Sequence, residues 1–391
     1  MLYNPISNIY SKNKSPIFFV IHGLPMGGAE KFLISLINHV QKKIENTILV
    51  ILGGECTLIN EVNRRVEIIY LRKKNRFDIS MVSTLHNLYN KRKPEKVFCV
   101  NAYSFFMAKM AGIGIKNIHF YLSPHTTVAF SRKYDLLSRL FLSRLNNKDT
   151  VIFLCQYQMR YIRKRYLANR GKSLIIYNGV DTKYNKPKEA LIKASHEIRK
   201  DMGIEQNEIV ILKVARLSKE KGHIHAIEGL KLLHEIYNIK AHLVFVGDGD
   251  SEFKKDLKKT VDKNNVNAYV HFAGQQQDVR PYYVCSTIFT LASTSETFSL
   301  SALEAISFGK PCVLTEVGGA REMIQSNMNG LLARAYDPGS LARAWNHLLS
   351  RPPLDQKRIR AHAIQHFDID TMFESYVKVF KGQPTNRLIH E

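Results

Sequence analysis

Two basic side chains, Arg216 and Lys221, have the types and spacing to do chemistry. They follow the apolar run Ile209–Val214, which has the composition of a β-strand, and Gly222 comes directly after them. A planar guanidinium beside a mobile ammonium can clamp a diphosphate, because each charge-assisted hydrogen bond contributes roughly 1.5–3 kcal/mol. Isolated basic residues are more often plain surface charges. The end of a strand, however, is where a phosphate would bind, so we interpret the segment as a candidate phosphate site.

Two glutamates, Glu296 and Glu304, follow the apolar run Ile288–Ala292. A carboxylate accepts two hydrogen bonds side by side, which suits the vicinal hydroxyls of a sugar. We expect a helix to begin near Ser299, between the two glutamates. Its first turn would offer a phosphate three backbone amides, those of Phe298, Ser299 and Leu300. The alternative is a solvent-exposed helix that carries two unrelated glutamates.

Adjacent glycines follow two further predicted strands. Gly27 and Gly28 come after the run Ile17–Ile21 and open a helical pattern, and Gly318 and Gly319 stand at a corresponding place in the second half. Adjacent glycines let the backbone approach a ligand closely, and a helix N-terminus attracts anions. The first pair is not part of a G-x-G-x-x-G sequence, so the nicotinamide fingerprint is absent there. A tight strand-to-helix turn explains this pair equally well.

Side chains at these places can act together only if the strands before them end at one edge of a sheet. Short apolar runs alternate with helical patterns in two series, and the runs are nearly continuous, as in parallel strands covered on both faces. They predict two doubly wound α/β domains with ligands at the carboxyl ends of the strands. The predicted strands are Ile17–Ile21, Ile48–Leu52, Val97–Val100, Ile118–Leu122, Val151–Cys155, Leu174–Tyr177, Ile209–Val214, His242–Val246, Tyr269–Ala273, Ile288–Ala292, Cys312–Thr315 and Gly330–Ala333.

The basic excess of the chain is confined to its first half. The formal charge is +23, and residues 1–187 hold 30 Lys and Arg against 10 Asp and Glu, whereas residues 188–391 hold 27 against 24. Such asymmetry indicates an anionic partner for the first half. Three interpretations compete for the basic stretches: a nucleic-acid surface, a membrane surface and a merely solvated helix. One stretch interleaves tyrosines with four basic residues, Arg160, Arg163, Lys164 and Arg165.

The cysteine pattern and the apolar runs bear on the cellular compartment. The five cysteines are scattered without a C-x-x-C pair, which argues against a disulfide framework and fits a reducing cytoplasm. The N-terminal stretch lacks a charged region that leads into a long apolar one, so we expect no signal peptide. No run approaches the ~18 apolar residues of a spanning helix. We therefore expect a cytoplasmic protein, soluble or peripheral to a membrane.

Taken in order along the chain, these motifs resemble the retaining, GT-B-fold glycosyltransferases of family 4, the glycosyl transferases group 1. Each motif alone is modest, whereas the ordered set is specific and spans nearly the whole chain, most densely in the second half. The motifs that carry the resemblance are Gly27–Glu30, Asn178–Asp181, Arg216 with Lys221, Val246–Gly249, Glu296 with Glu304, and Gly318–Glu322.

The resemblance implies the GT-B fold, in which two Rossmann-like domains face each other across a cleft. Residues 1–185 would bind the acceptor, 186–205 would form a linker region, and 206–366 would bind a nucleotide-sugar donor. A C-terminal helix and tail, 367–391, would return to the first domain. The enzyme would be a hexosyl- or other glycosyltransferase that retains the configuration of the transferred sugar.

The resemblance also implies roles for single residues. Arg216 and Lys221 would neutralise the donor diphosphate in place of a metal, and Glu304 would bind the ribose hydroxyls. Glu296 and His125 would be catalytic, the first holding a hydroxyl of the donor sugar and the second lying near the anomeric carbon. Gly28 and the Phe298, Ser299 and Leu300 backbone would approach the phosphates. We expect a UDP- or GDP-sugar as co-substrate, with no other cofactor and no metal.

The charge asymmetry then falls in the predicted acceptor domain. We expect an anionic acceptor, lipid-linked or part of a lipopolysaccharide or polysaccharide, at the inner face of the cytoplasmic membrane. The basic patch of Arg160, Arg163, Lys164 and Arg165 would bind the anionic membrane surface. The alternatives are an epimerase- or phosphorylase-like enzyme of the same fold, a protein that binds the donor but has lost activity and, on net charge alone, a nucleic-acid-binding protein. The chain has no zinc-finger spacing, RNA-binding sheet signature or basic zipper, so we expect no nucleic-acid partner.

Overall fold

The chain folds as two compact units of α/β type in a computed structural model. The structure describes residues 15–71, 80–125, 132–142, 144–167 and 171–384. Unit 1 comprises the residues up to Ile176 together with those from Phe373 onward, and unit 2 comprises Tyr177–Met372. The chain therefore passes between the units twice, the second time within its last helix.

Unit 1 is built on a seven-stranded, all-parallel sheet of order β3-β2-β1-β4-β5-β6-β7. Its strands are β1 (Ile17–Ile21), β2 (Thr47–Ile51), β3 (Glu67–Tyr70), β4 (Lys96–Cys99), β5 (His119–Leu122), β6 (Thr150–Phe153) and β7 (Lys172–Ile175). Its helices are α1 (Gly28–Gln41), α2 (Ser80–Arg92), α3 (Ala102–Ala111), α4 (Arg132–Leu142), α5 (Gln156–Ile162) with a π-turn over Arg163–Leu167, and most of α14 (Ile369–Phe380).

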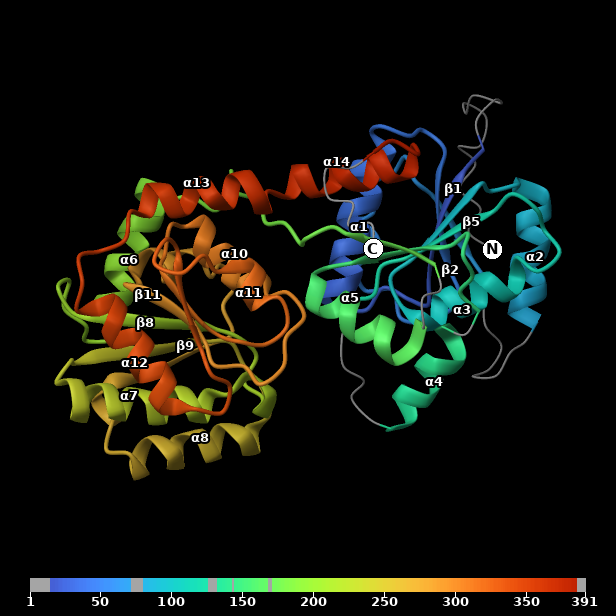
Figure 1. Ribbon diagram of the computed structural model, residues 1–391. Coiled ribbons are helices and arrows are strands. Elements are labelled where there is room, and N and C mark those ends of the chain that lie inside the picture. Colours follow the sequence, from blue (N-terminus) through green and yellow to red (C-terminus); the bar gives the residue numbers. More distant parts are fainter. Residues whose placement is uncertain (1–14, 72–79, 126–131, 143, 168–170, 385–391) are drawn as a thin grey trace. The chain divides into compact units, whose positions relative to one another are not determined.

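Unit 2 is built on a six-stranded, all-parallel sheet of order β10-β9-β8-β11-β12-β13 (Figure 1). Its strands are β8 (Ile209–Val214), β9 (Ala241–Val246), β10 (Val270–Gly274), β11 (Ile288–Leu291), β12 (Cys312–Thr315) and β13 (Gly330–Ala333). Its helices are α6 (Glu189–Asp201), α7 (His223–Tyr237), α8 (Ser251–Lys263), α9 (Arg280–Cys285), α10 (Leu300–Ser307), α11 (Ala320–Met323), α12 (Pro338–Leu349) and α13 (Gln356–Phe367).

The strand predictions are confirmed, with one omission. All twelve predicted strands are present within two residues at either end, and their apolar side chains are buried because helices cover the sheets. The strand that the pattern missed is β3, which lies at the edge of the first sheet. Three of its residues are half-buried and Tyr70 is 50% exposed, so β3 lacks the continuous apolar run that marks the others.

Each sheet has one point where the strand order reverses, and a doubly wound sheet binds ligands at that point, beyond the carboxyl ends of its strands. In unit 1 the reversal lies between β1 and β4, and in unit 2 it lies between β8 and β11. Strand β8 leads to the segment with Arg216 and Lys221, and β11 leads to the segment with Glu296. The topology thus brings the two candidate segments of the second half to one edge of one sheet.

The segment predicted as a linker, residues 186–205, has a fold of its own. It contains α6, which packs against α9 inside unit 2, and the division between the units falls earlier, after Ile176. Arg199 on α6 explains the packing, because its buried guanidinium donates hydrogen bonds to the carbonyl oxygens of Glu205 (2.6 Å) and Cys285 (2.8 Å). The lysines and glutamates that suggested a linker lie mainly on the exposed face of α6.

The last helix, α14, packs its C-terminal half into unit 1. The ring of Phe380 lies 5.4–5.9 Å from the rings of Phe19, Phe98 and Tyr121. The buried Tyr376 hydroxyl is hydrogen bonded to Ser123 Oγ at 3.1 Å. These aromatic contacts attach the C-terminal segment to the core of the first sheet.

Removing the Phe380 ring should test how much stability this attachment provides. We expect Phe380→Ala to lower the free energy of unfolding of unit 1 by about 3–5 kcal/mol, the usual loss for a buried phenylalanine. Urea denaturation of the full chain measures the loss, and Lys381→Ala at the exposed neighbouring position is the matched control. Equal midpoints for both variants would show that α14 is not part of the folded core.

Candidate active site

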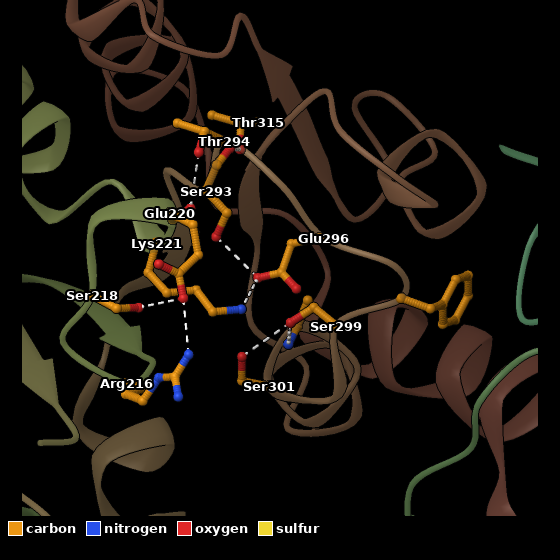
Figure 2. A network of polar contacts seen from close by, with 12 residues as sticks. Arg216, Ser218, Glu220, Lys221, Ser293, Thr294, Glu296, Ser299, Ser301 and Thr315 are labelled. Carbon is orange, nitrogen blue, oxygen red and sulfur yellow. Dashed lines mark hydrogen bonds and ion pairs between the residues drawn. The ribbon is translucent and has the colours of Figure 1, made fainter. Parts of the chain in front are cut away.

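The candidate site of unit 2 lies where β8 and β11 end, and Figure 2 shows its polar network. After β8 the chain forms a short 3-10 turn, Lys219–Lys221, and then turns into α7 through Gly222. The backbone oxygen of Glu220 accepts hydrogen bonds from the amide (2.8 Å) and the hydroxyl (3.2 Å) of Thr294. These bonds fasten the turn after β8 to the loop after β11 through one backbone–backbone bond and one side chain–backbone bond.

Lys221 and Glu296 form the central contact of the network. The Lys221 Nζ lies 2.7 Å from Glu296 Oε1, and the Ser293 hydroxyl donates a hydrogen bond to the same oxygen at 3.0 Å (Figure 2). The two charged side chains are only 24% and 16% exposed, so water screens their attraction less than at an open surface. An anion that entered here would compete with the carboxylate for the ammonium.

Arg216 is far more open than Lys221. Its side chain is 69% exposed and makes an ion pair with Glu220 Oε1 at 3.0 Å, an oxygen that also accepts a hydrogen bond from the Ser218 hydroxyl at 2.7 Å. Exposed pairs of this kind contribute about 0–1 kcal/mol. The guanidinium can therefore turn toward a ligand at little energetic cost.

The N-terminus of α10 follows the Glu296 loop, as the sequence predicted. Ser299 caps the helix, because its hydroxyl accepts a hydrogen bond from the Ala302 amide at 3.3 Å. The Phe298 ring is 5% exposed and stacks on Tyr177 at 5.1 Å, while Leu300 is 45% exposed. Phe298 thus anchors the loop through its side chain, so any contact that it makes with a ligand would come from its backbone.

A small pocket opens beside this helix start. Its lining comes from the ends of β11 and β12, the loops that follow them and the short helix α11, and includes the 296–299 segment, Leu314, Thr315, Val317 and Gly319. The Thr315 hydroxyl donates a hydrogen bond to the Ser293 carbonyl at 2.6 Å, which ties the end of β12 to the Glu296 loop. This bond therefore joins two of the segments that line the pocket.

Glu304 lies one turn further along α10 and is largely buried. Its Oε2 accepts a hydrogen bond from the Tyr283 hydroxyl at 2.7 Å. Burial raises the pKa of Glu304, and the Tyr283 hydrogen bond opposes that rise. The tyrosine fixes the carboxylate through one oxygen, so the carboxylate has its second oxygen to offer a hydroxyl.

Two further predicted site residues, His125 and Gly28, belong to unit 1. In the described part of the chain the buried Nε2 of His125 has no hydrogen-bond partner, and the ring packs 4.3 Å from that of Phe32. Burial lowers the pKa of His125 to about 4, so the imidazole is neutral at neutral pH. Gly28 begins α1, and a Cβ added there would meet no atom within 4 Å. Packing does not require glycine at this position.

Three of the four residues of the predicted basic patch are exposed. Arg160, Lys164 and Arg165 are exposed, whereas Arg163 is half-buried and donates a hydrogen bond to the Ser173 hydroxyl. Arg165 also makes an ion pair with Asp135 on α4 at 2.7 Å, which joins the π-turn to that helix. We call the α4–α5 surface the exposed side chains of these two helices and the π-turn: Leu136, Arg139, Leu140, Tyr157, Arg160, Lys164 and Arg165.

Two aspartates near β9 have a spacing that can signal a metal site. In the structure Asp250 caps α8 by accepting from the Glu252 and Phe253 amides, and Asp248 pairs with Lys254. Both are therefore engaged in local structure. Within the described ranges, no three His, Cys, Asp or Glu side chains are grouped to hold a metal ion.

Sequence reasoning missed three side chains that shape the site. Ser293 shares Glu296 with Lys221, Tyr283 orients Glu304, and Tyr177 stacks on Phe298. Ser293 lies three residues before Glu296 and could have been found as a hydroxyl in the same loop. Tyr283 lies on α9 and Tyr177 is the first residue of unit 2, so only the tertiary fold brings them to the site.

Two family models match the chain, and together they cover both units. Residues 194–365 match the model described as glycosyl transferases group 1, and residues 26–184 match the model described as glycosyltransferase family 4. The first match lies within unit 2, and the second covers most of unit 1 and the first residues of unit 2. The fold comparison agrees: HepE of Anabaena in complex with UDP has a TM-score of 0.77 at 20% identity, over 94% of this chain and all of that chain.

Two curated relatives are similar in sequence. An uncharacterized glycosyltransferase of Methanocaldococcus jannaschii is 30% identical over 46% of this chain, a stretch that spans 45% of that protein's own length. The UDP-Gal:alpha-D-GlcNAc-diphosphoundecaprenol alpha-1,3-galactosyltransferase of Escherichia coli is 27% identical over 68% of this chain and 70% of that protein.

Gly222 is the position at which the site's geometry should be most sensitive to substitution. Its backbone is left-handed (φ +65°), and a Cβ there would lie 1.9 Å from the Ala292 carbonyl oxygen. Gly203 has the same conformation (φ +67°) with no atom within 4 Å of such a Cβ, so it is the matched control. Both alanine variants should lose about 1–2 kcal/mol for the left-handed backbone.

We expect Gly222→Ala to lose a further 1–3 kcal/mol or so, the usual cost of overpacking. Urea denaturation of the two variants measures this difference. Equal losses for both would mean that the turn after β8 can move away from β11, contrary to the packing described above.

Proposed function

Because the chain belongs to the glycosyltransferases described by these two family models, we propose that it moves a sugar, with retention of configuration, from a nucleotide-sugar donor to an anionic, lipid-linked or polysaccharide acceptor. One observation carries the donor part of the proposal. A half-buried ammonium, Lys221, lies at the topological switch point of unit 2, paired with a carboxylate that an incoming diphosphate can replace.

The donor would bind through groups of three kinds. The Lys221 ammonium and the Arg216 guanidinium supply positive charge for the diphosphate, and the amides at the start of α10 add hydrogen bonds. Glu304, oriented by Tyr283, would accept from the ribose hydroxyls. UDP- or GDP-sugars suit this arrangement, and the fold relative HepE was solved with UDP and with UDP-glucose.

Charge stabilisation would drive the chemical step. As the bond from the anomeric carbon to the diphosphate breaks, negative charge grows on the departing nucleotide, and fixed cations at that place stabilise the transition state. Lys221 and Arg216 would have this role, so we propose that the reaction needs no metal. The acceptor hydroxyl would attack from the face that the diphosphate leaves, which retains the configuration of the sugar.

Glu296 and His125 would position the sugar. Once Lys221 turns to the diphosphate, the Glu296 carboxylate has an oxygen with which to accept a bond from a sugar hydroxyl. His125 is neutral at neutral pH because burial lowers its pKa to about 4, so it would act as a hydrogen-bonding group and not as a cation. These roles follow the family resemblance residue by residue.

The acceptor side of the proposal rests on the charge of unit 1. The α4–α5 surface joins exposed Leu136 (69%) and Leu140 (52%) to exposed basic side chains. Each Lys or Arg near an anionic leaflet contributes about 1 kcal/mol, and apolar side chains add shallow insertion. None of the described helices is long and apolar enough to cross a membrane. We therefore propose peripheral binding to the inner face of the cytoplasmic membrane, where a lipid-linked acceptor would lie.

Nucleotide titration tests the donor site. The wild-type protein should bind UDP or GDP in the presence of EDTA, and Lys221→Ala and Glu304→Ala should each weaken that binding about tenfold, the effect of about 1.4 kcal/mol from one lost contact. Isothermal calorimetry measures the affinities. Lys219→Ala removes an exposed ammonium from the same turn and should leave the affinity unchanged.

Three outcomes would contradict the donor assignment. The first is that neither nucleotide binds, the second is that binding needs a divalent metal, and the third is that all three variants bind like the wild type. Thermal unfolding of each variant separates a lost contact from a lost fold.

Vesicle flotation tests the membrane surface. Reversing Arg160 and Lys164 to glutamate should weaken binding to anionic vesicles at low salt by about thirtyfold or more, because at least two favourable charges of about 1 kcal/mol each are removed. The matched control reverses Lys258 and Lys259, two exposed lysines of α8 in unit 2. The double variant Leu136→Ser with Leu140→Ser should weaken binding at low and high salt alike.

The membrane proposal is wrong if the wild-type protein fails to float with anionic vesicles at low salt. It is also wrong if the α8 control loses as much binding as the α4–α5 variant, since the net charge alone would then explain the attraction.

A further inference from the structure

Lys213 is a fully buried lysine whose amine is not hydrogen bonded to the rest of the described chain. It lies on β8, one residue before the strand ends, and has 0% exposure. Its Nζ has no hydrogen-bond partner among the described residues. A buried polar group without a partner is costly, and in a native protein such a group calls for an explanation.

Another buried lysine, Lys310, shows what a structural lysine looks like in the same unit. Its Nζ donates hydrogen bonds to the carbonyl oxygens of Val284 (3.1 Å) and Ser286 (2.7 Å). Lys213 has no such bonds. A purely structural role therefore explains Lys310 and leaves Lys213 unexplained.

The strand register places Lys213 beneath the candidate site. It pairs with Phe245 on β9, and neighbouring residues of parallel strands point to the same face of the sheet. The Phe245 ring lies 5.0 Å from the ring of His223, the first residue of α7, which follows the Lys221 turn. Lys213 is thus on the face that the start of α7 covers.

Two charged groups act on Lys213, namely Glu296 in the loop after β11 and Lys221 in the turn after β8. Lys213 in turn helps to lower the pKa of His223 at the start of α7, where burial is the main cause. Burial lowers the pKa of Lys213, the Glu296 carboxylate opposes that change and the Lys221 charge adds to it, so that the pKa lies at about 7. While Lys221 is paired with Glu296, a protonated Lys213 would have no counter-ion. The neutral amine of Lys213 is therefore favoured in this state.

Donor binding changes this balance. On the proposed function, on which this inference rests, the diphosphate draws the Lys221 ammonium away from Glu296. The Glu296 carboxylate, 16% exposed, would then keep, of the contacts described above, only the hydrogen bond from the Ser293 hydroxyl. A half-buried carboxylate that has lost its cation is unfavourable unless another positive charge replaces it.

We propose that Lys213 is this replacement. When the diphosphate engages Lys221, the Nζ of Lys213 takes up one proton from solvent and becomes the counter-ion of Glu296, which keeps the carboxylate charged and in place to hold a sugar hydroxyl. The step forms one N–H bond and breaks no bond of the donor. Lys213 is therefore a positioning residue that acts through Glu296, and donor binding is coupled to proton uptake.

Proton uptake can be measured directly by calorimetry. UDP is titrated into the full-length protein at pH 8 in two buffers that differ in ionisation enthalpy, with GDP as the probe if UDP does not bind. The difference in observed heat gives the number of protons bound. The wild-type protein should take up most of one proton, because the nucleotide phosphates are already ionised at this pH and Lys213 is mainly neutral before binding.

The matched variants are Lys213→Met and Lys219→Met. Methionine keeps the length of the buried side chain, so Lys213→Met should fold and be at least as stable as the wild type, yet take up no proton. Lys219→Met changes an exposed lysine of the neighbouring turn and should behave like the wild type. Between pH 7 and pH 9 the wild-type affinity should fall by up to tenfold per pH unit, since the bound state holds the extra proton, whereas that of Lys213→Met should stay level.

The outcomes separate this inference from the proposed function. Nucleotide binding without proton uptake, or uptake that persists in Lys213→Met, overturns the role of Lys213 and leaves the donor site standing. Failure of both UDP and GDP to bind the wild-type protein overturns the donor site, and the role of Lys213 with it.

Discussion

The contact between Lys221 and Glu296 determines what the carboxyl edge of unit 2 can do. It joins opposite charges from the two strands between which the sheet order reverses, at 2.7 Å and with little exposure to water. Each partner needs the other as long as no anion is present, because a half-buried charge without a counter-ion is unfavourable. The pair therefore keeps a cation available at the edge of the sheet without leaving it unpaired.

Much of the surrounding structure serves to hold this pair in place. Thr294 fastens the turn after β8 to the loop after β11, and Thr315 fastens that loop to β12. Gly222 allows the turn to lie against the Ala292 carbonyl, where a side chain would not fit. Around this rigid centre lie groups with more freedom, such as the exposed Arg216. A diphosphate would thus meet one fixed cation and one mobile cation.

The architecture could be predicted because the strands of a doubly wound sheet are continuous apolar runs. The turns at Arg216 to Gly222 and at Glu296 to Leu300 were predictable for the same reason, since their places after strands follow from the order of the runs. Strand β3 escaped prediction because an edge strand with half-buried residues has no such run. The linker prediction placed the boundary too late, because the polar composition of α6 reflects its exposed face.

The details of the site could not be predicted, because they depend on side chains that only the fold brings together. Nothing in the sequence indicates that Tyr283 on α9 meets Glu304, or that Arg163 turns to Ser173 and not to solvent. Lys213 is the clearest example. In the sequence it is one polar residue in an otherwise apolar strand, and only the fold shows that its amine is fully buried and feels the Lys221 and Glu296 charges.

A structure of the protein with UDP bound would show directly whether a diphosphate displaces Glu296 from Lys221. We expect the Lys221 Nζ to leave Glu296 and to lie about 3 Å from a diphosphate oxygen, with the diphosphate at the start of α10. A complex in which Lys221 remains on Glu296 while the diphosphate is held by other residues would contradict this expectation.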